Sequence, residues 1–254
     1  MRIDVKSLAC RRSGRLVFAG LSFGLKEGEA LLVTGRNGAG KSSLLAILSG
    51  EIRPETGAIR TEGIGERTLP EALHLVGHRD ALKGALTAEE NLAFARDLLG
   101  DPALAPAEAL ETVGLAHAAP LPVAYLSAGQ RRRVALARLL VSRRPLWLLD
   151  EPTSALDAAA QETLLGLMRT HLAGGGLIVA ATHAVLPIEG ARELRIERTP
   201  PSPLRGGEGV GVEGPESDGA IASSSDWASG GPIPGQSPSG ATPTPGPSPQ
   251  GEGK

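Results

Sequence analysis

A glycine-rich stretch lies near the N-terminal end of the chain and reads Gly35-Arg36-Asn37-Gly38-Ala39-Gly40-Lys41-Ser42-Ser43. It matches the pattern G-x-x-x-x-G-K-S of a phosphate-binding loop, or P-loop. Its glycines permit backbone angles that a side chain would block, so successive N–H groups can turn toward an anion. Lys41 is placed to reach the β- and γ-phosphates of a nucleotide, and the Ser42 hydroxyl is placed to bind Mg²⁺. We therefore take all of these residues as candidate nucleotide-binding residues.

The segments on either side of the loop support this interpretation. A P-loop follows a strand and opens a helix. Residues 30–34 form an apolar run of the length of a buried strand, and residues 41–49 have the composition of a short helix that Gly50 would end. The alternative is a glycine loop that matches the pattern by chance. The two correct flanks argue against it.

Composition excludes several classes of protein. The chain has 254 residues, room for one large domain or two small ones, and its net charge of −2 argues against a nucleic-acid partner. Cys10 is the one cysteine, which leaves no internal disulfide. No apolar run approaches the length of a membrane span, and the N-terminus lacks the apolar core of a signal peptide. We expect a cytoplasmic protein that needs a partner if it acts at a membrane.

The rest of the pattern divides the chain into three parts. Residues 3–33 indicate antiparallel strands, residues 54–57 a turn and residues 73–76 a further strand. The pattern becomes helical from Arg79, with a capping box at Thr87 and Glu90, a helix to about residue 99 and a second helix over 105–113. We interpret residues of about 79–142 as a helical subdomain inserted into the strand-rich body.

Strands and helices alternate in the remainder of the body. Ser127 is a good N-cap for a helix, and strands are predicted over 146–149, 177–181 and 192–197, with a helix over 157–171. The folded domain is therefore placed at 1–198. Residues 199–254 hold 11 Pro and 13 Gly, a composition that predicts a disordered tail. It is either a regulatory or partner-binding segment or a dispensable extension.

Three further residues carry candidate chemistry. Asp150 follows an apolar strand, where a carboxylate beside a P-loop can hold Mg²⁺. Glu151 is placed to polarise the water that attacks the γ-phosphate, and His183 to hold that water and the γ-phosphate. Taken alone, the carboxylates read as an ordinary loop start and the histidine as an exposed residue. With Lys41 they form a candidate catalytic set.

Together these motifs resemble those of ATP-binding-cassette (ABC) ATPases. Leu126-Ser127-Ala128-Gly129-Gln130 is similar to the family's signature sequence, Ser154-Ala155-Leu156-Asp157 to its D-loop, and Thr182-His183 to its switch histidine. The resemblance implies an α/β fold: a P-loop NTPase nucleotide-binding domain of the ABC type, with an antiparallel β subdomain and the inserted helical subdomain. It also implies a homodimer that encloses ATP and Mg²⁺, in which Ser127, Gly129, Gln130 and Asp157 contact the nucleotide across the interface.

Two positions depart from the general family pattern. His78 stands where a glutamine usually links the metal site to the membrane partner, and Arg12 stands where an aromatic ring usually stacks on adenine. A guanidinium plane can also stack on a base, and a histidine can still donate or accept a hydrogen bond. Both residues remain candidates for nucleotide binding.

The segments 75–92 and 126–139 narrow the resemblance to the ATPase subunits of cytochrome c biogenesis haem exporters, the CcmA family. This implies a membrane-spanning permease subunit, a location on the cytoplasmic face of the bacterial inner membrane and a link to haem-handling proteins. The alternatives are the ATPase of another exporter for drugs, lipids or polysaccharides, a soluble ABC protein that acts on ribosomes or DNA, and a module that binds ATP without turnover.

Overall fold

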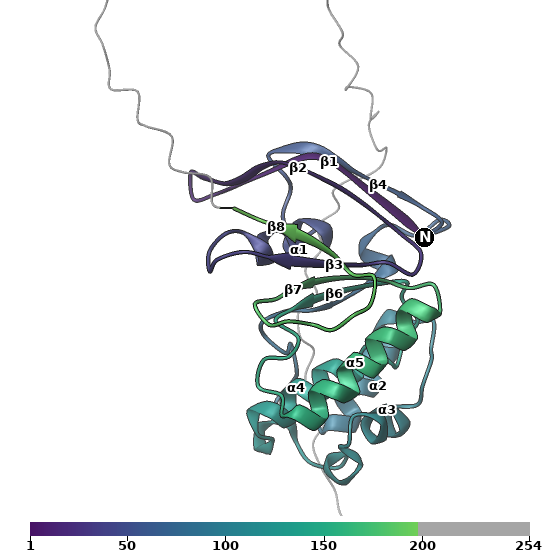
Figure 1. Ribbon diagram of the computed structural model, residues 1–254. Helices are drawn as coiled ribbons and strands as arrows, with labels where there is room; N and C mark the ends of the chain where they lie inside the picture. The colour runs from purple at the N-terminus through teal and green to yellow at the C-terminus, as the bar shows by residue number, and fades with distance from the viewer. Residues whose placement is uncertain (198–254) are drawn as a thin grey trace, which may run out of the picture. The chain divides into compact units, whose positions relative to one another are not determined.

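The computed structural model describes residues 1–197, and the predicted tail 199–254 lies outside the described residues. Two β-sheets and a group of helices make up this part of the chain (Figure 1). A three-stranded antiparallel sheet has the order β2-β1-β4, and a five-stranded parallel sheet has the order β5-β6-β7-β3-β8. The α/β class predicted from the sequence is confirmed.

The antiparallel sheet is built from a long hairpin and one additional strand. Strands β1 (Arg2–Arg12) and β2 (Arg15–Lys26) pair antiparallel around the turn at Ser13 and Gly14. Strand β4 (Thr56–Glu62) pairs with the other edge of β1. The prediction of a turn over 54–57 was wrong at its second half, because β4 begins at Thr56. Most of β4 is exposed and Ile59 is its one large apolar residue, so the alternation that marks a strand is missing.

The parallel sheet consists of short strands, and all of them except the exposed edge strand at Arg192–Arg195 are mostly buried. Two of them, β6 (Leu146–Asp150) and β7 (Leu177–Ala181), are buried at every position, which explains their continuous apolar composition. The others are β3 (Ala30–Thr34), β5 (Leu73–Val76) and β8 (Arg192–Arg195). Because all pairings are parallel, the carboxyl ends of the strands meet at one edge of the sheet. That edge positions the site described below.

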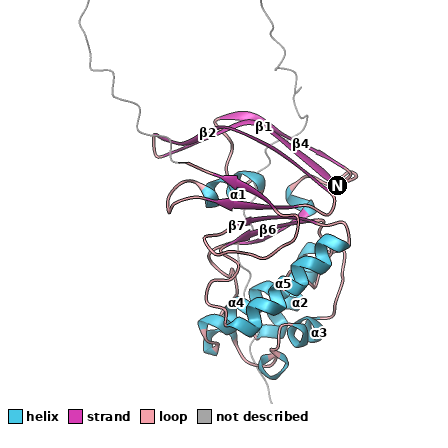
Figure 2. Cartoon of the chain, in the orientation of Figure 1, coloured by secondary structure: helices cyan, strands magenta, loops and turns pink. Residues whose placement is uncertain are grey.

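Helices cover both faces of the parallel sheet (Figure 2). Helix α1 (Lys41–Leu48) packs between the two sheets in a core that includes Phe18, Leu44 and Val179. Helix α5 (Ala158–Ala173) covers the opposite face and shares a second core with α4 (Ala128–Ala137). The parallel sheet is therefore the central layer, with a separate core on each side.

A third core lies within the helical segment. It joins α2 (Ala88–Leu99), α3 (Pro106–Thr112) and α4. Short 3₁₀ turns occupy Ala116–Ala118 and Val123–Tyr125 in this segment, and another, Pro70–Ala72, precedes β5. The capping box predicted at Thr87 and Glu90 is confirmed, with both hydrogen bonds present. The helix begins at Ala88, directly after the Thr87 N-cap, as that capping box predicts. The loop before it is held by buried Asn91, whose side-chain amide donates to the carbonyls of Lys83 and Thr87.

None of the helices within residues 1–197 is long and apolar enough to cross a membrane.

Candidate functional site

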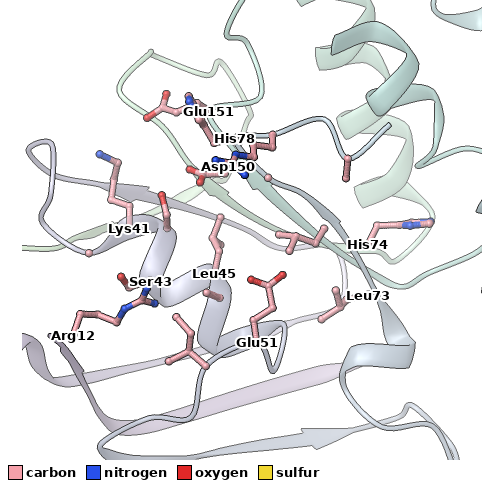
Figure 3. Close-up of a pocket in the computed structure, with 18 of the residues that line it drawn as sticks. Arg12, Lys41, Ser43, Leu45, Glu51, Leu73, His74, His78, Asp150 and Glu151 are labelled. Carbon is pink, nitrogen blue, oxygen red and sulfur yellow. The ribbon is translucent and has the colours of Figure 1, made fainter. Parts of the chain in front are cut away.

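A large cleft runs along the carboxyl edge of the parallel sheet (Figure 3). Its volume is about 1250 Å³, more than the roughly 300–1,000 Å³ of a typical small-molecule site. The loops that follow four neighbouring strands contribute to its lining. The predicted site residues that line it are Arg12, Asn37, Gly38, Gly40, Lys41, Ser42, Ser43, His78, Asp150, Glu151 and His183. Open parallel sheets bind ligands at this edge, which agrees with a nucleotide site here.

The P-loop connects β3 to α1 through a tight backbone path. A Cβ atom at Gly35 would lie 2.4 Å from the carbonyl oxygen of Ile196, so no other residue fits there without displacing backbone. Helix α1 begins after Gly40 with no side chain capping its first turn. The free N–H groups of that turn and the positive end of the helix are the elements that bind phosphate in such loops. Gly35, Arg36 and Ala39 shape the loop without lining the cleft, and Ala39 is buried in the core.

Lys41 links the P-loop to the catalytic candidates on the neighbouring strands. Its ammonium group donates to the carbonyl of Gly35 at 3.0 Å and lies 2.9 Å from Nε2 of His183. The same histidine nitrogen lies 3.3 Å from a carboxylate oxygen of Glu151. A single ring nitrogen can accept from Lys41 or donate to Glu151, but not both at once. His183 therefore sits at a junction between the cation and the carboxylate, where the terminal phosphate of a nucleotide would enter.

Glu151 has an unusual backbone conformation. Its φ angle is 45°, in the left-handed region that non-glycine residues seldom adopt. The peptide is held by a hydrogen bond from Glu151 N to the carbonyl of Ala181, and the carboxylate accepts a hydrogen bond from His183 N at 3.3 Å. Strained backbone at a cleft marks residues whose orientation matters for function. The left-handed backbone angle at Glu151 bends the chain after β6, and both Asp150 and Glu151 line the cleft.

The oxygen donors present fit a magnesium ion bound together with phosphate. Ser42 and Asp150 both line the cleft, and Asp150 is buried to 7% exposure at the end of β6. Within the part of the chain that the structure describes, no group of three or more His, Cys, Asp or Glu side chains forms a self-sufficient metal site. Mg²⁺ commonly takes one or two protein oxygens and completes its shell with water and substrate phosphates, so this sparse donor set suits it.

The signature residues lie outside this cleft. Ser127, Gly129, Gln130 and Asp157 are absent from its lining. Ser127 caps α4 in a capping box with Gln130, and Asp157 caps α5 by accepting from Ala160 N at 2.8 Å. Gly129 sits so close to the D-loop that an added Cβ would lie 2.9 Å from the Ala155 carbonyl oxygen. The signature helix and the D-loop thus pack against each other, and their signature residues do not line the cleft that contains the P-loop.

Some cleft residues were not singled out from the sequence. Glu51 and Arg138 also line the cleft, and Figure 3 shows Glu51 between Leu45 and Leu73. Neither belongs to a recognisable motif, since a single charged residue in a loop or helix carries no spacing signal. Only the three-dimensional structure shows that the cleft extends well beyond the P-loop.

Comparison with protein families matches residues 18–154 to the ABC transporter family model. Curated relatives include the cytochrome c biogenesis ATP-binding export protein CcmA of Bradyrhizobium diazoefficiens, 57% identical over 197 residues. The CcmA of Rhodopseudomonas palustris strain BisB5 is 58% identical over 199 residues. In both cases the match covers 77% of this chain and 98% of the relative.

Similar solved structures include the ATP-binding subunit of an ABC transporter, 27% identical with a TM-score of 0.68, which matches 77% of this chain and 88% of that one. An ATP-binding cassette solved as a dimer in a post-hydrolysis state with ADP and phosphate is 25% identical, with a TM-score of 0.66. That match covers 80% of this chain and 99% of the other.

Proposed function

This chain belongs to the ABC transporter family, among the CcmA proteins, and from that premise we propose that it is the ATP-hydrolysing subunit of a haem exporter in c-type cytochrome biogenesis. The observation that carries the hydrolytic part is the cleft itself. It brings the P-loop, Asp150, Glu151 and His183 to one edge of the parallel sheet. A module that only bound ATP would have no need of that carboxylate and histidine beside Lys41.

We infer the following roles for these residues in hydrolysis. Glu151 accepts a proton from water as its oxygen attacks the γ-phosphorus, and the bond from that phosphorus to the bridging oxygen of ADP breaks. Lys41 and the P-loop N–H groups stabilise the negative charge on the phosphoryl oxygens. Mg²⁺ held by Ser42 and Asp150 would neutralise part of the same charge. His183 moves from Lys41 to the γ-phosphate when the nucleotide is bound.

The active unit is proposed to be a homodimer. The cleft contains one half of the family's motifs, while Ser127 and Gly129 lie on a separate surface of the same chain. Two copies placed head to tail would bring each signature surface to the other copy's P-loop. The N-terminus of α4 would then direct its free N–H groups and positive dipole end at the γ-phosphate. Gln130 and Asp157 support this surface through the helix caps.

Arg12 and His78 are proposed to serve the nucleotide and the membrane partner respectively. Arg12 is exposed at the end of β1 and lines the cleft near Ser43, where its guanidinium plane can stack on adenine (Figure 3). His78 is exposed at the cleft beyond the end of β5, beside Asp150. It can sense the nucleotide on one side and a partner subunit on the other.

The contact with the membrane permease is proposed for residues 79–89, on the cytoplasmic face of the inner membrane. Asn91 fixes this loop through its bonds to Lys83 and Thr87, and the Lys83 ammonium lies 4.8 Å from the centre of the Phe94 ring. Phe94 is 47% exposed and Leu98 is 72% exposed on the same helix. A fixed loop beside exposed apolar side chains is typical of a protein–protein interaction surface.

Two experiments test this proposal. Glu151→Gln should bind ATP and hydrolyse it about 10²–10⁴ times more slowly, because an amide cannot accept the proton. Wild-type turnover in that variant would refute the assignment of the base. Charge reversal at Arg79 or Lys83 should impair assembly with the permease and maturation of c-type cytochromes. Unchanged assembly and maturation in both variants would place the contact elsewhere.

The exporter's cargo is tested genetically. In a strain that lacks this chain, covalently bound haem in c-type cytochromes should be lost, and should return with the wild-type chain but not with Glu151→Gln. If the cytochromes mature normally without the chain, the alternative of an exporter for another substrate is favoured.

A further inference from the structure

One buried cation joins three parts of the site that no sequence motif connects. Arg132 lies on α4, in the turn after the signature residues, and its side chain is only 5% exposed. It does not itself line the cleft. Burial of an arginine is costly unless its donors are satisfied, so the partners that it contacts reveal what it does.

The guanidinium group reaches the end of β6, where the catalytic carboxylates lie. Its Nη2 donates to the carbonyl of Asp150 at 2.7 Å and to the carbonyl of Glu151 at 2.8 Å. Arg132 therefore holds the peptide groups on both sides of the Glu151 Cα. These are the groups whose orientation defines the left-handed conformation at Glu151, with its φ of 45°.

The second terminal nitrogen reaches the loop that carries His78. Nη1 donates to the carbonyl of Gly77 at 2.8 Å and to a carboxylate oxygen of Asp80 at 3.2 Å. The ion pair with Asp80 is mostly shielded, since that carboxylate is 24% exposed. Bonds to a charged donor in such surroundings are stronger than neutral ones. One planar group thus fixes the signature helix, the catalytic strand end and the His78 loop in a single arrangement.

We propose that Arg132 is a positioning residue that holds Glu151 in its strained, water-activating orientation and ties it to α4 and to the His78 loop. The inference rests on the proposed role of Glu151 as the base. Without Arg132 the carbonyls of Asp150 and Glu151 lose their shared donor, and the peptide can relax toward an unstrained angle. ATP binding would persist, because the P-loop is untouched, while the carboxylate would point away from the attacking water.

The test compares Arg132→Met, Arg132→Lys and Asp80→Asn in the full chain, with Arg133→Met as the matched control. Arg133 is the adjacent arginine, and among residues 1–197 its side chain makes only long bonds of 3.4 Å to the carbonyls of Val113 and Gly114, outside the cleft. Binding of Mg-ATP and single-turnover hydrolysis are measured for each. Arg132→Met should lose about 10²-fold in the rate of hydrolysis, the cost of a misplaced catalytic group. Its dissociation constant for Mg-ATP should change less than about threefold.

The conservative variants and a second background separate positioning from general destabilisation. Arg132→Lys retains the positive charge but not the two terminal nitrogens of the guanidinium group, so its rate of hydrolysis should fall about tenfold. The rate of Asp80→Asn should fall by a similar or smaller factor. In a Glu151→Gln background Arg132→Met should cause no further loss, because it acts through a carboxylate that is no longer there. A loss that multiplies with that of Glu151→Gln would overturn the proposal, as would weakened ATP binding or an equal loss in Arg133→Met.

Other outcomes are equally decisive. If Arg132→Met does not fold, Arg132→Lys and Asp80→Asn carry the test, and full activity in both overturns the proposal. If Glu151→Gln is slow while every Arg132 variant is fully active, only the positioning role fails. If the wild-type chain does not hydrolyse ATP, or Glu151→Gln hydrolyses it normally, the proposed function fails and the role of Arg132 falls with it.

Discussion

The two edges of the parallel sheet use histidine in opposite ways. At the carboxyl edge, the His183 side chain is 45% exposed and touches both Lys41 and Glu151. At the amino edge, His171 stacks on Trp147 with ring centroids 3.9 Å apart, and His74, which also contributes to the cleft lining, is buried against the carbonyl of Ser142. Burial lowers the pKa of His74 to about 4 and that of His171 to about 4, so both are neutral near pH 7. One edge is arranged for chemistry and the other for stability.

The largest loss of activity is expected from a change of Lys41 at the carboxyl edge. Lys41→Met should lower the rate of ATP hydrolysis by more than about 10²-fold, because the phosphoryl charge loses its nearest cation. Thermal unfolding without nucleotide should change little. Lys83→Met, which removes an exposed cation outside the cleft, is the control for hydrolysis by the isolated chain. Normal turnover in Lys41→Met would show that ATP is not hydrolysed at this edge of the sheet.

The amino edge should respond in the reverse manner. Trp147→Ala removes a ring that is 4% exposed and leaves a cavity under His171. Its free energy of unfolding in urea should fall by about 3–5 kcal/mol. The rate of hydrolysis per folded molecule should stay close to wild type, as no part of the ring reaches the P-loop cleft. A loss of turnover without a loss of stability would contradict this division of roles.

Acid should destabilise the protein through the same edge. For His74 and His171 the folded-state pKa is lower than the unfolded value, so the unfolded chain binds the protons more readily. Stability is therefore full above pH 6.5 and falls as the pH drops from 6.5 toward 4, by up to about 3 kcal/mol per histidine. Urea titrations at several pH values measure this slope. His171→Phe retains the aromatic stack but cannot bind the proton, so the free energy of unfolding should depend less on pH in that variant. An unchanged pH dependence in both His171→Phe and His74→Phe would show that these histidines do not cause the loss of stability in acid.

The smallest expected change in stability comes from a matched pair of helix caps. Thr87 and Ser127 form equivalent capping boxes on α2 and α4, so replacing either by Ala should cost about 1 kcal/mol. Only Ser127→Ala should also slow hydrolysis, because only that hydroxyl is proposed to meet a nucleotide. Equal activity in the two variants would reduce Ser127 to a helix cap.

Much of this arrangement was predictable because the informative residues are close in sequence. Residues 30–50 contain the strand, the P-loop and all of α1 within one local pattern, and buried strands such as β6 and β7 are recognisable as apolar runs. Strand β4 was missed since its side chains are mostly exposed and its stability comes from hydrogen bonds to β1. The hydrogen bonds by which Asn91 holds the loop before Ala88 were not predictable, because the partners of a buried amide side chain leave no local sequence pattern.

The contacts of Arg132 lay beyond prediction for a different reason. Its partners Gly77 and Asp150 are 55 and 18 residues away in sequence. The periodicity of apolar residues carries no information about a hydrogen bond from a side chain to a distant carbonyl. The neutral state of His171 likewise depends on a stack with Trp147 that only the packed sheet creates. Motifs predict which residues do chemistry, while the residues that hold them in place are found only in the fold.

If each active site is shared between two copies of the chain, mixing two inactive variants should restore activity. Lys41→Met inactivates the P-loop and Ser127→Arg blocks the signature surface, so each variant alone should be inactive. A mixed dimer would regain one intact site. Rapid mixing of the two at equal concentration should restore about a quarter of wild-type turnover, since half of the dimers are mixed and each has one of its two sites intact. No recovery, from variants shown to be folded and able to exchange subunits, would contradict a shared site.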